Sequence, residues 1–328
     1  MADKSTNIYL ICGDEEFLKL EKKNRLLRLY GAEESINFNE FSGRDQDISE
    51  LRDLADTLPF MQEHRVILLS DTGLFKGASD ERFEEFLREL NSTTVLIFFE
   101  SETDAANKLF KLVKEKGEVS KFIKTDSMSY KEAEAEQLKI GERVKKYLKE
   151  EGREISGKNL NNLLMLTGYD LFNIHNELEK LICYTEGRES SDREIKEEDI
   201  EAVCSKTVSD RVFDMLSAKL SGNTKKAFKL YEEMLSVRTA PMKILFMLER
   251  QFNQVYILKE LLSSGISEGE AAKKMEIQPW LLRKLRDQSR NLRKADARRY
   301  LERSIELEEK VKTGDIEDRI AVELLLIE

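Results

Sequence analysis

The chain has 328 residues, of which 40% are apolar and 36% are charged, and its formal net charge is −10. This length fits two or three domains rather than one, and the composition is that of a soluble globular protein with more charge than the usual ~25%. Because only three prolines and fifteen glycines can interrupt helices, a largely helical chain is expected.

Five short runs of strand character lie in the first part of the chain, separated by stretches with helical periodicity. They read IYLIC, INFNEF, RVILLS, TVLIFF and KFIKT, at residues 8–12, 36–41, 65–70, 94–99 and 121–125. Near-continuous apolar runs are typical of strands buried on both faces, and βα alternation predicts a parallel sheet with right-handed crossovers. We therefore expect residues 1–130 to form a three-layer α/β core.

The rest of the chain reads as helical. Between residues 131 and 206 three helical stretches predict a small helical domain, and two of them close with a Gly that can adopt the left-handed conformation. From residue 207 to residue 328 every segment has helical spacing, with Ser, Thr or Asp at many starts and Gly at many ends. These residues predict a third, all-helical domain.

Charge is unevenly divided along the chain. Residues 207–328 contain 23 basic and 20 acidic residues, a balance of +3, which leaves −13 for residues 1–206. Since nucleic-acid affinity comes largely from Lys and Arg that release counterions, the acidic first part is not expected to be a general phosphate-binding surface.

Cysteine spacing and the amino terminus bear on the compartment. Cys12, Cys183 and Cys204 are far apart and lack C-x-x-C spacing, so neither a disulfide framework nor a zinc site is expected. The chain opens without an apolar signal segment, and no run reaches the ~18 apolar residues of a membrane span. We therefore expect a cytoplasmic protein without a membrane partner.

The stretch GDEEFLKL, residues 13–20, has the register of a phosphate-binding loop. Such a loop reads G-x-x-x-x-G-K-[ST], and its glycines, Lys and hydroxyl hold phosphates and Mg²⁺. Here Gly13 and Lys19 are in place, but Leu18 and Leu20 replace the second Gly and the hydroxyl residue. A strand-to-helix turn with acidic residues in the first helical turn is therefore the better interpretation, and no cofactor is expected.

Catalytic and metal-binding patterns are otherwise missing from the sequence. The third strand-like run is followed by Asp71 alone, without the Asp-Glu pair that would hold Mg²⁺ and polarise water. The only two histidines, His64 and His175, lie in no recognisable nucleophile or metal arrangement, and Cys12 lies in an apolar strand where a thiol is typically inert. We expect no catalytic residue, no metal site and no intrinsic catalysis.

The stretch DTLPFMQEHR, residues 56–65, follows a helical pattern and places apolar residues before the next strand. Pro59 biases Leu58 toward an extended conformation, which would present Leu58, Phe60 and Met61 as a compact apolar tip. Two interpretations remain open from the residues alone. The tip inserts into a groove of a partner, or it folds back to cover the sheet.

The segment from Arg283 to Arg303 is the one strongly basic part of the chain, with nine basic and three acidic residues. It suggests either a contact with DNA phosphates or the solvated face of packed helices. The candidate DNA-facing residues are Arg283, Lys284, Arg286, Arg290 and Arg293. Trp280, just before them, is interpreted as a packing anchor.

Several stretches, in their order and spacing, resemble the delta subunits of bacterial DNA polymerase III clamp loaders. They are IYLICGDEEFL, LADTLPFMQEHRVILL, GYDLFNIHNELEKLICY, DRVFDMLSAKLSGN, the long run LERQFNQVYILKELLSSGISEGEAAKKMEIQPWLLRKLRDQSRNL and KTGDIEDRIAVELLLI. The resemblance spans nearly the whole chain. It implies an AAA+-like α/β core and a small lid domain, both without a nucleotide site, followed by a helical collar domain.

The same resemblance implies a function in DNA replication. In the family, the apolar tip enters a hydrophobic pocket of the ring-shaped sliding clamp, which here implicates Leu58, Phe60 and Met61; the relatives often carry two adjacent aromatic residues where this chain has Phe60 and Met61. Further implied partners are the loader ATPase subunits and the delta-prime subunit, through the collar, and primer-template DNA in the assembled complex. A DNA-directed DNA polymerase or nucleotidyltransferase label would then reflect membership of the holoenzyme.

The resulting hypothesis is a subunit that binds the sliding clamp and opens the ring without hydrolysing ATP itself. Two alternatives from other classes stay open at this stage. One is an active ATPase of related fold, and the other is a DNA-binding module that uses the basic C-terminal helices.

Overall fold

The computed structural model describes residues 6–44, 47–78, 80–188, 192–204, 206, 208–290 and 292–328. The chain divides into two compact units, Met1–Ser127 and Met128–Glu328, each of which is described by itself. The strands of the first unit are β1 (Ile8–Gly13), β2 (Phe38–Ser42), β3 (Arg65–Ser70), β4 (Thr94–Glu100) and β5 (Glu118–Phe122). Its helices are α1 (Glu16–Leu29), α2 (Ile48–Asp56), α3 (Glu81–Glu89), α4 (Lys108–Lys116) and the short 3₁₀ helix η1 (Thr125–Ser127).

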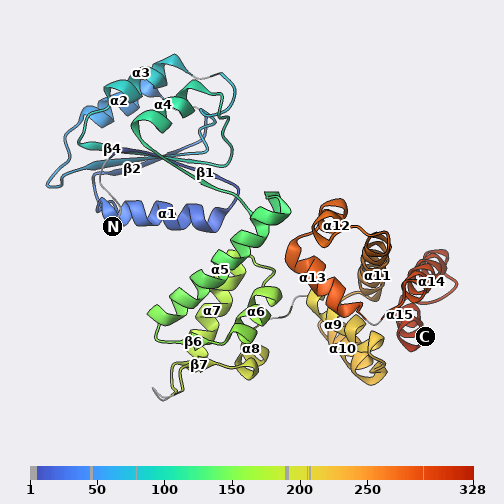
Figure 1. The fold of residues 1–328 in the computed structure, drawn as a ribbon. Coiled ribbons are helices and arrows are strands. Elements are labelled where there is room, and N and C mark those ends of the chain that lie inside the picture. Colours follow the sequence, from blue (N-terminus) through green and yellow to red (C-terminus); the bar gives the residue numbers. More distant parts are fainter. Residues whose placement is uncertain are drawn as a thin grey trace. The chain divides into compact units, whose positions relative to one another are not determined.

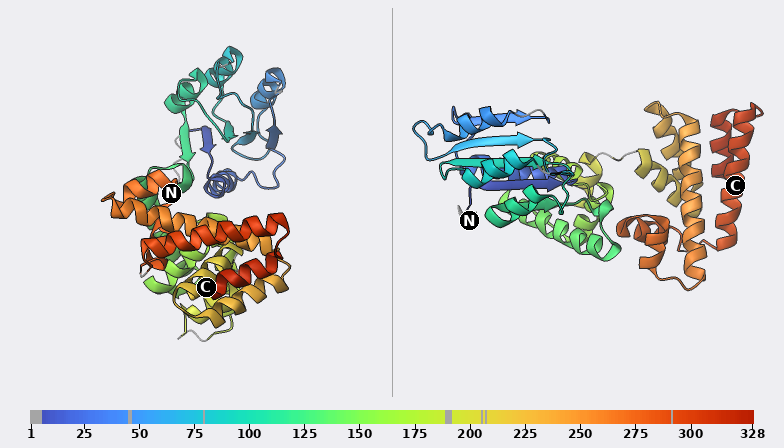
Figure 2. Two further views of the ribbon diagram at one scale, coloured as in Figure 1. Left: turned by 90° about the vertical axis from the view of Figure 1, so that its right-hand side faces the viewer. Right: turned by 90° about the horizontal axis from the view of Figure 1, so that it is seen from above.

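The five strands form one parallel sheet in the order β2-β3-β4-β1-β5. They lie side by side in the right-hand view of Figure 2. The chain moves from β1 to the β2 edge, returns through β3 and β4, and then crosses to the other side of β1. The predicted parallel α/β sheet is therefore confirmed.

Helices cover both faces of this sheet (Figure 1). On one face, Leu26 and Tyr30 at the end of α1 pack on alternate strand residues such as Ile11 and Val66. On the other face, α2, α3 and α4 bury apolar side chains against a second set of strand residues. Since burial of one such side chain contributes ~1.5–3 kcal/mol, both apolar layers stabilise the sheet, and the predicted three-layer architecture is confirmed.

The fifth strand lies three residues earlier than the sequence pattern predicted, at 118–122 rather than 121–125. Gly117 causes this shift because it ends α4 and brings the backbone against β1: a Cβ at this position would lie 2.3 Å from the Ile8 carbonyl oxygen. The strand starts at the next residue. It is an edge strand of half-buried polar and apolar residues, so an apolar run was the wrong signal for it.

The second unit is formed mainly of helices. They are α5 (Tyr130–Glu150), α6 (Gly157–Leu166), α7 (Leu171–Thr185), α8 (Glu197–Val203), α9 (Val208–Leu220), α10 (Thr224–Ser236), α11 (Pro241–Ser263), α12 (Glu268–Met275), α13 (Pro279–Gln288), α14 (Lys294–Thr313) and α15 (Asp318–Ile327). The predicted helical character is confirmed, with one exception. A parallel pair of two-residue strands, β6 (Glu154–Ile155) and β7 (Glu194–Ile195), is too short to leave a pattern in the sequence.

Two apolar cores lie in the helical region from α9 to α15. One is built by α9, α10, α11, α14 and α15, and the other mainly by α11, α12 and α13. Lys219 is buried beside the first core, where its Nζ lies 3.5 Å from the Leu326 carbonyl oxygen and 4.7 Å from the centre of the Tyr300 ring. The division of this unit between residues 206 and 207 stays a prediction.

Helix α5 also contacts α12 and α13. The ring of Trp280 lies 6.2 Å from that of Tyr169, in agreement with a packing role for this residue. None of the helices in the described part of the chain combines the length and the hydropathy needed to cross a bilayer.

Candidate protein-interaction site

The apolar tip lies in the loop between α2 and β3, which protrudes from the sheet in Figure 1. Leu58 is 75% exposed, Phe60 is 60% exposed and Met61 is 89% exposed. These side chains therefore do not fold back over the sheet. Large apolar side chains that water surrounds are a feature of interaction sites when they are grouped in one place.

The backbone of the tip is held in place by one buried side chain. Asn37, which is 3% exposed, accepts a hydrogen bond from the Phe60 N–H at 2.7 Å through Oδ1 and donates to the Phe60 carbonyl oxygen at 2.9 Å through Nδ2. The same Nδ2 donates to Gln62 Oε1 at 2.8 Å. Both polar groups of the Phe60 backbone are therefore hydrogen-bonded, which restrains the loop at this residue.

Further polar contacts close the base of the loop. Ser35 Oγ donates to Gln62 Oε1 at 2.6 Å, and Gln62 Nε2 donates to the Gly31 carbonyl oxygen at 3.2 Å. On the other side, the buried Arg65 donates from Nε to the Thr57 carbonyl oxygen at 3.1 Å. The tip thus combines a fixed backbone with free apolar side chains, which limits the entropy lost on binding.

A fourth exposed apolar side chain was missed by the sequence reasoning. Ile36 was assigned to a strand, but β2 begins at Phe38 and Ile36 is 73% exposed. It lies between Ser35 and Asn37, both of which are bonded to the tip loop. Alternation along the run INFNEF gave no sign that Ile36 precedes the strand.

The degenerate phosphate loop follows β1, at the carboxyl ends of the strands, whereas the tip lies at the amino ends. Gly13 has φ +114°, and a Cβ on it would lie 1.8 Å from the Phe122 carbonyl oxygen. This glycine is therefore required for the close approach of β5. Its presence needs no bound phosphate as an explanation.

Acidic side chains occupy the start of α1. Glu15 accepts a hydrogen bond from the Phe17 N–H, and Asp14 accepts from the Lys124 N–H at 2.6 Å and from Ser127 Oγ at 2.7 Å. Burial alone would raise the pKa of Asp14, but these hydrogen bonds outweigh it and lower the pKa. The carboxylate is thus ionised where a triphosphate would bring further negative charge.

The lysine of the loop is also engaged. Lys19 is 1% exposed, and its Nζ lies 3.0 Å from Glu16 Oε2 and 4.4 Å from the centre of the Phe99 ring. Its charge is therefore balanced within the protein. A phosphate-binding lysine would instead point its amine at the ligand.

At the ends of β3 and β4, Glu100 and Thr72 contact each other. Glu100 is buried and accepts hydrogen bonds from the N–H and the hydroxyl of Thr72, while burial raises its pKa. Burial likewise raises the pKa of the Cys12 thiol. No cluster of His, Cys, Asp and Glu suited to a metal ion occurs among the residues that the structure describes.

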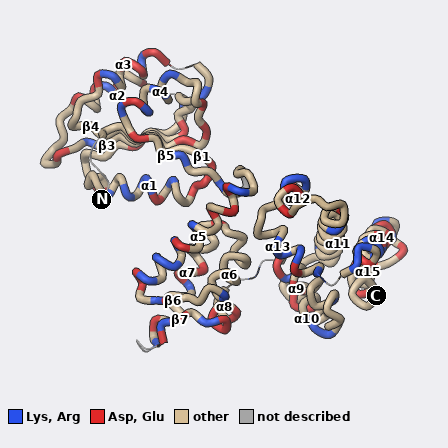
Figure 3. Tube along the Cα trace, in the orientation of Figure 1, with Lys and Arg blue, Asp and Glu red and all other residues tan. Residues whose placement is uncertain are grey.

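The basic segment is largely neutralised by ion pairs, and acidic residues accompany the basic ones along α13 and α14 in Figure 3. Four of the five candidate DNA-facing residues have carboxylate partners: Arg283 with Glu134 at 3.2 Å, Lys284 with Asp210 at 3.1 Å, Arg286 with Glu268 at 2.8 Å and Arg293 with Asp296 at 2.7 Å. Arg290 is exposed and forms no ion pair within the described ranges. A contact with DNA through this segment stays a prediction.

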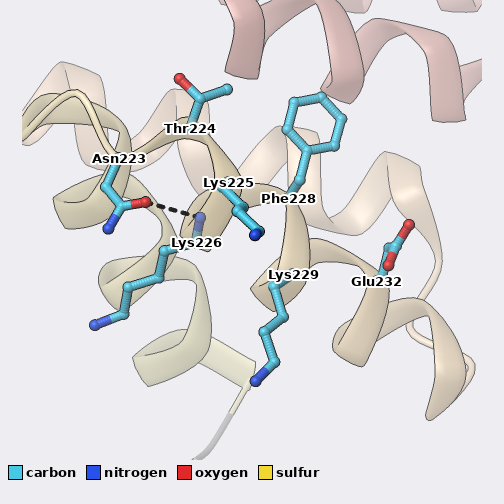
Figure 4. Close-up of a pocket in the computed structure, with 7 residues that line it drawn as sticks. All are labelled: Asn223, Thr224, Lys225, Lys226, Phe228, Lys229 and Glu232. Atoms are coloured by element: carbon cyan, nitrogen blue, oxygen red, sulfur yellow. Dashed lines mark hydrogen bonds between the residues drawn. The ribbon is translucent and has the colours of Figure 1, made fainter.

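A hollow at the start of α10 is lined by Lys225, Lys226, Lys229 and Phe228, among other residues (Figure 4). The lysines are exposed, and the first turn of the helix is capped by Asn223, whose Oδ1 accepts from the Lys226 N–H at 3.0 Å. No buried polar group of the lining residues points into the hollow. It is therefore not assigned a function.

The fold defines an α/β protein with a helical C-terminal region, and the loop before β3 carries an exposed apolar tip. Two family models match the chain: DNA polymerase III, delta subunit, over residues 9–122, and DNA polymerase III delta subunit, C-terminal domain, over residues 209–328. Together they cover more than half of its length. The chain belongs to the DNA polymerase III delta subunit family.

Individual relatives agree with this membership. The chain is 19% identical over 335 residues to DNA polymerase III subunit delta of Bacillus subtilis (strain 168), covering 98% of this chain and 92% of the relative. It is 23% identical over 267 residues to the probable DNA polymerase III subunit delta of Aquifex aeolicus (strain VF5), covering 79% of this chain and 72% of the relative.

A solved structure supports the fold independently. The Bacillus subtilis DNA clamp loader delta protein aligns with a TM-score of 0.63 at 19% identity, over 98% of this chain and 94% of that chain. At this identity the likeness concerns the fold. It matches the α/β unit and the helical unit in one chain.

Proposed function

We propose that this protein is the clamp-loader subunit that binds the sliding clamp through Leu58, Phe60 and Met61 and opens the ring for loading onto primed DNA. One observation carries the proposal: the three side chains are exposed while the backbone between them is fixed by Asn37. A preorganised apolar projection fits insertion into a hydrophobic pocket of a partner.

Ring opening requires more than binding. A protein shifts an equilibrium only by its differential affinity for the two states, so the contacts of the tip must favour the open ring over the closed one. This step needs no chemistry from the chain itself. ATP acts on the neighbouring ATPase subunits and changes how the assembly presents the tip.

The helical region 207–328 supplies the second interface of the proposal. It acts as a collar that joins the ATPase subunits and the delta-prime subunit, and it brings the assembly to primer-template DNA. A polymerase label would follow from membership of the holoenzyme, since we propose no catalysis by this chain.

The two alternatives have less support from the geometry. An active ATPase would need phosphate-binding amides and a free lysine, whereas Glu15 caps the start of α1 and Lys19 is paired with Glu16. A DNA-binding module would need unpaired basic residues, whereas carboxylates neutralise most of the basic segment.

The test is binding of the purified chain to the sliding clamp of the same organism. The variant Leu58→Ala/Phe60→Ala removes two exposed side chains of the tip. The matched control is Leu138→Ala/Phe246→Ala, since Leu138 is 71% exposed and Phe246 is 56% exposed in the second unit. Both variants should stay within ~0.5 kcal/mol of the parent stability, as is usual for exposed positions.

The tip variant should lose at least thirtyfold in affinity, because truncation of an interface hot spot costs about 2 kcal/mol or more. The control should bind as the parent does. Release of the clamp from circular DNA, measured with the same proteins, then reports ring opening. Equal binding by both folded variants would refute the tip as the clamp-binding site.

A further inference from the structure

The exposed apolar surface of the α/β unit is larger than the tip loop. Resting on the proposed function, we infer that Ile36 belongs to the same docking face as Leu58, Phe60 and Met61. We further infer that the clamp pocket receiving this face is bordered by Lys and Arg side chains. Neither the contact made by Ile36 nor the basic border of the clamp pocket follows from Leu58, Phe60 and Met61 alone.

Two loops are joined into one face by side-chain hydrogen bonds. Gly31 and Ser35 are both bonded to Gln62, at 3.2 Å and 2.6 Å. Asn37 is bonded to Gln62 at 2.8 Å and to both polar groups of the Phe60 backbone. Since Ile36 lies between Ser35 and Asn37, its backbone is fixed beside the tip loop.

The exposure of Ile36 is unusual within its unit. Among the described residues from 6 to 127, the large apolar side chains that are exposed are Ile36, Leu58, Phe60 and Met61. The remaining large apolar side chains of the unit are buried or half-buried. Exposed apolar surface is thus concentrated on the two loops, which is expected of one continuous interface.

The charged residues within the two loops have one sign, although Arg28 and Arg65 flank the loops. The two loops, residues 31–37 and 56–64, contain Glu33, Glu34, Asp56 and Glu63 and no Lys or Arg. All four carboxylates are on exposed residues. An acidic border would be repelled by an acidic pocket and attracted by a basic one, so the charge identifies the chemistry of the partner surface.

The sign can be tested with two charge-matched variants of the full chain. Glu33→Gln/Glu34→Gln removes two charges beside the docking face, and Glu81→Gln/Glu115→Gln removes two exposed charges from α3 and α4. Affinity and association rate for the sliding clamp are measured for both at several salt concentrations. Ile36→Ala is measured beside them at one salt concentration.

We expect Glu33→Gln/Glu34→Gln to weaken binding roughly threefold to tenfold at low salt, mainly through the association rate, and to flatten the salt dependence. Ile36→Ala should weaken binding roughly tenfold, because it removes apolar area from the interface. The control Glu81→Gln/Glu115→Gln should bind as the parent does.

The outcomes separate this inference from the proposed function. Loss of binding by Leu58→Ala/Phe60→Ala with parent-like binding by Ile36→Ala and by Glu33→Gln/Glu34→Gln would overturn the inference alone. Tighter binding after removal of Glu33 and Glu34 charges would overturn the basic border. Parent-like binding by Leu58→Ala/Phe60→Ala would refute the proposed function itself.

Discussion

Replacement of Asn37 by Ala is the sharpest perturbation of the tip that does not alter its exposed surface. Asn37 is buried and makes three hydrogen bonds to the loop, two of them to the Phe60 backbone. Asn37→Ala removes all three and leaves Leu58, Phe60 and Met61 in place. It therefore tests whether a fixed backbone is needed for binding.

The magnitude follows from the contacts. Each hydrogen bond contributes about 1 kcal/mol net, and the freed groups of the exposed loop can bond to water, so we expect a loss of ~2–3 kcal/mol in unfolding free energy. The affinity for the clamp should fall by roughly tenfold, because a loosened loop must be ordered again on binding at about 1 kcal/mol or more.

Asn107→Ala is a close control for this experiment. Asn107 is also 3% exposed, and its Nδ2 donates to the carbonyl oxygens of Leu74 at 3.1 Å and Gly77 at 3.2 Å. Its Oδ1 accepts from the Phe110 N–H at 3.0 Å. It lies at the start of α4, so its loss should destabilise the unit similarly without releasing the tip.

The assays are denaturant unfolding, hydrogen exchange of the Phe60 amide and clamp binding, each measured for both variants. Asn37→Ala should accelerate exchange at Phe60 and weaken binding, whereas Asn107→Ala should lower stability only. Preorganisation of the tip would be refuted if the Asn37→Ala variant had the parent's hydrogen-exchange rate at the Phe60 amide and the parent's affinity for the clamp. An equal affinity loss in both variants would show that general stability is responsible.

Three further predictions concern other parts of the chain. Gly13→Ala should destabilise the α/β unit by ~3 kcal/mol or more in denaturant unfolding, since its Cβ would lie 1.8 Å from a backbone oxygen of β5. Gly77→Ala, at φ +64° with open space around it, should cost only about 1 kcal/mol. Burial lowers the pKa of Lys219 to about 8, so the folded state releases this proton before the unfolded state does, and stability should rise between pH 8 and about 10.4. Lys219→Met should remove that rise. The check is the unfolding free energy of both proteins at about pH 7.5, just below this window, and at about pH 10, inside it. In DNA binding by the isolated chain, Arg290→Gln should lower the salt dependence by about 1, whereas Arg283→Gln, whose parent side chain pairs with Glu134, should leave it nearly unchanged.

Much of the fold could be predicted from the sequence, because the buried parallel strands leave long apolar runs. β3 and β4 are buried on both faces and were located within one residue. β5 is an edge strand with mixed polarity, so periodicity placed it too late. The pair β6 and β7 depends on contacts between distant segments, which no local pattern records.

The site was predicted only in part, for a similar reason. Leu58, Phe60 and Met61 could be singled out because Pro59 interrupts the pattern between a helix and a strand. Their exposure could not be predicted, since it depends on Asn37, which is 23 residues away from Phe60 in the chain. Ile36 was lost for the same reason, because only the contacts of its neighbours place it beside the tip.

The degenerate phosphate loop and the apolar tip lie at opposite ends of the strands of one parallel sheet. Gly13 and Glu100 are at the ends of β1 and β4, whereas Asn37 and the tip precede β2 and β3. Strands of five to seven residues separate these ends by about 20 Å. Changes at the carboxyl ends of the strands therefore need not disturb the tip at their amino ends. If the proposed function holds, control of the tip by ATP must come through the neighbouring subunits that hold this chain.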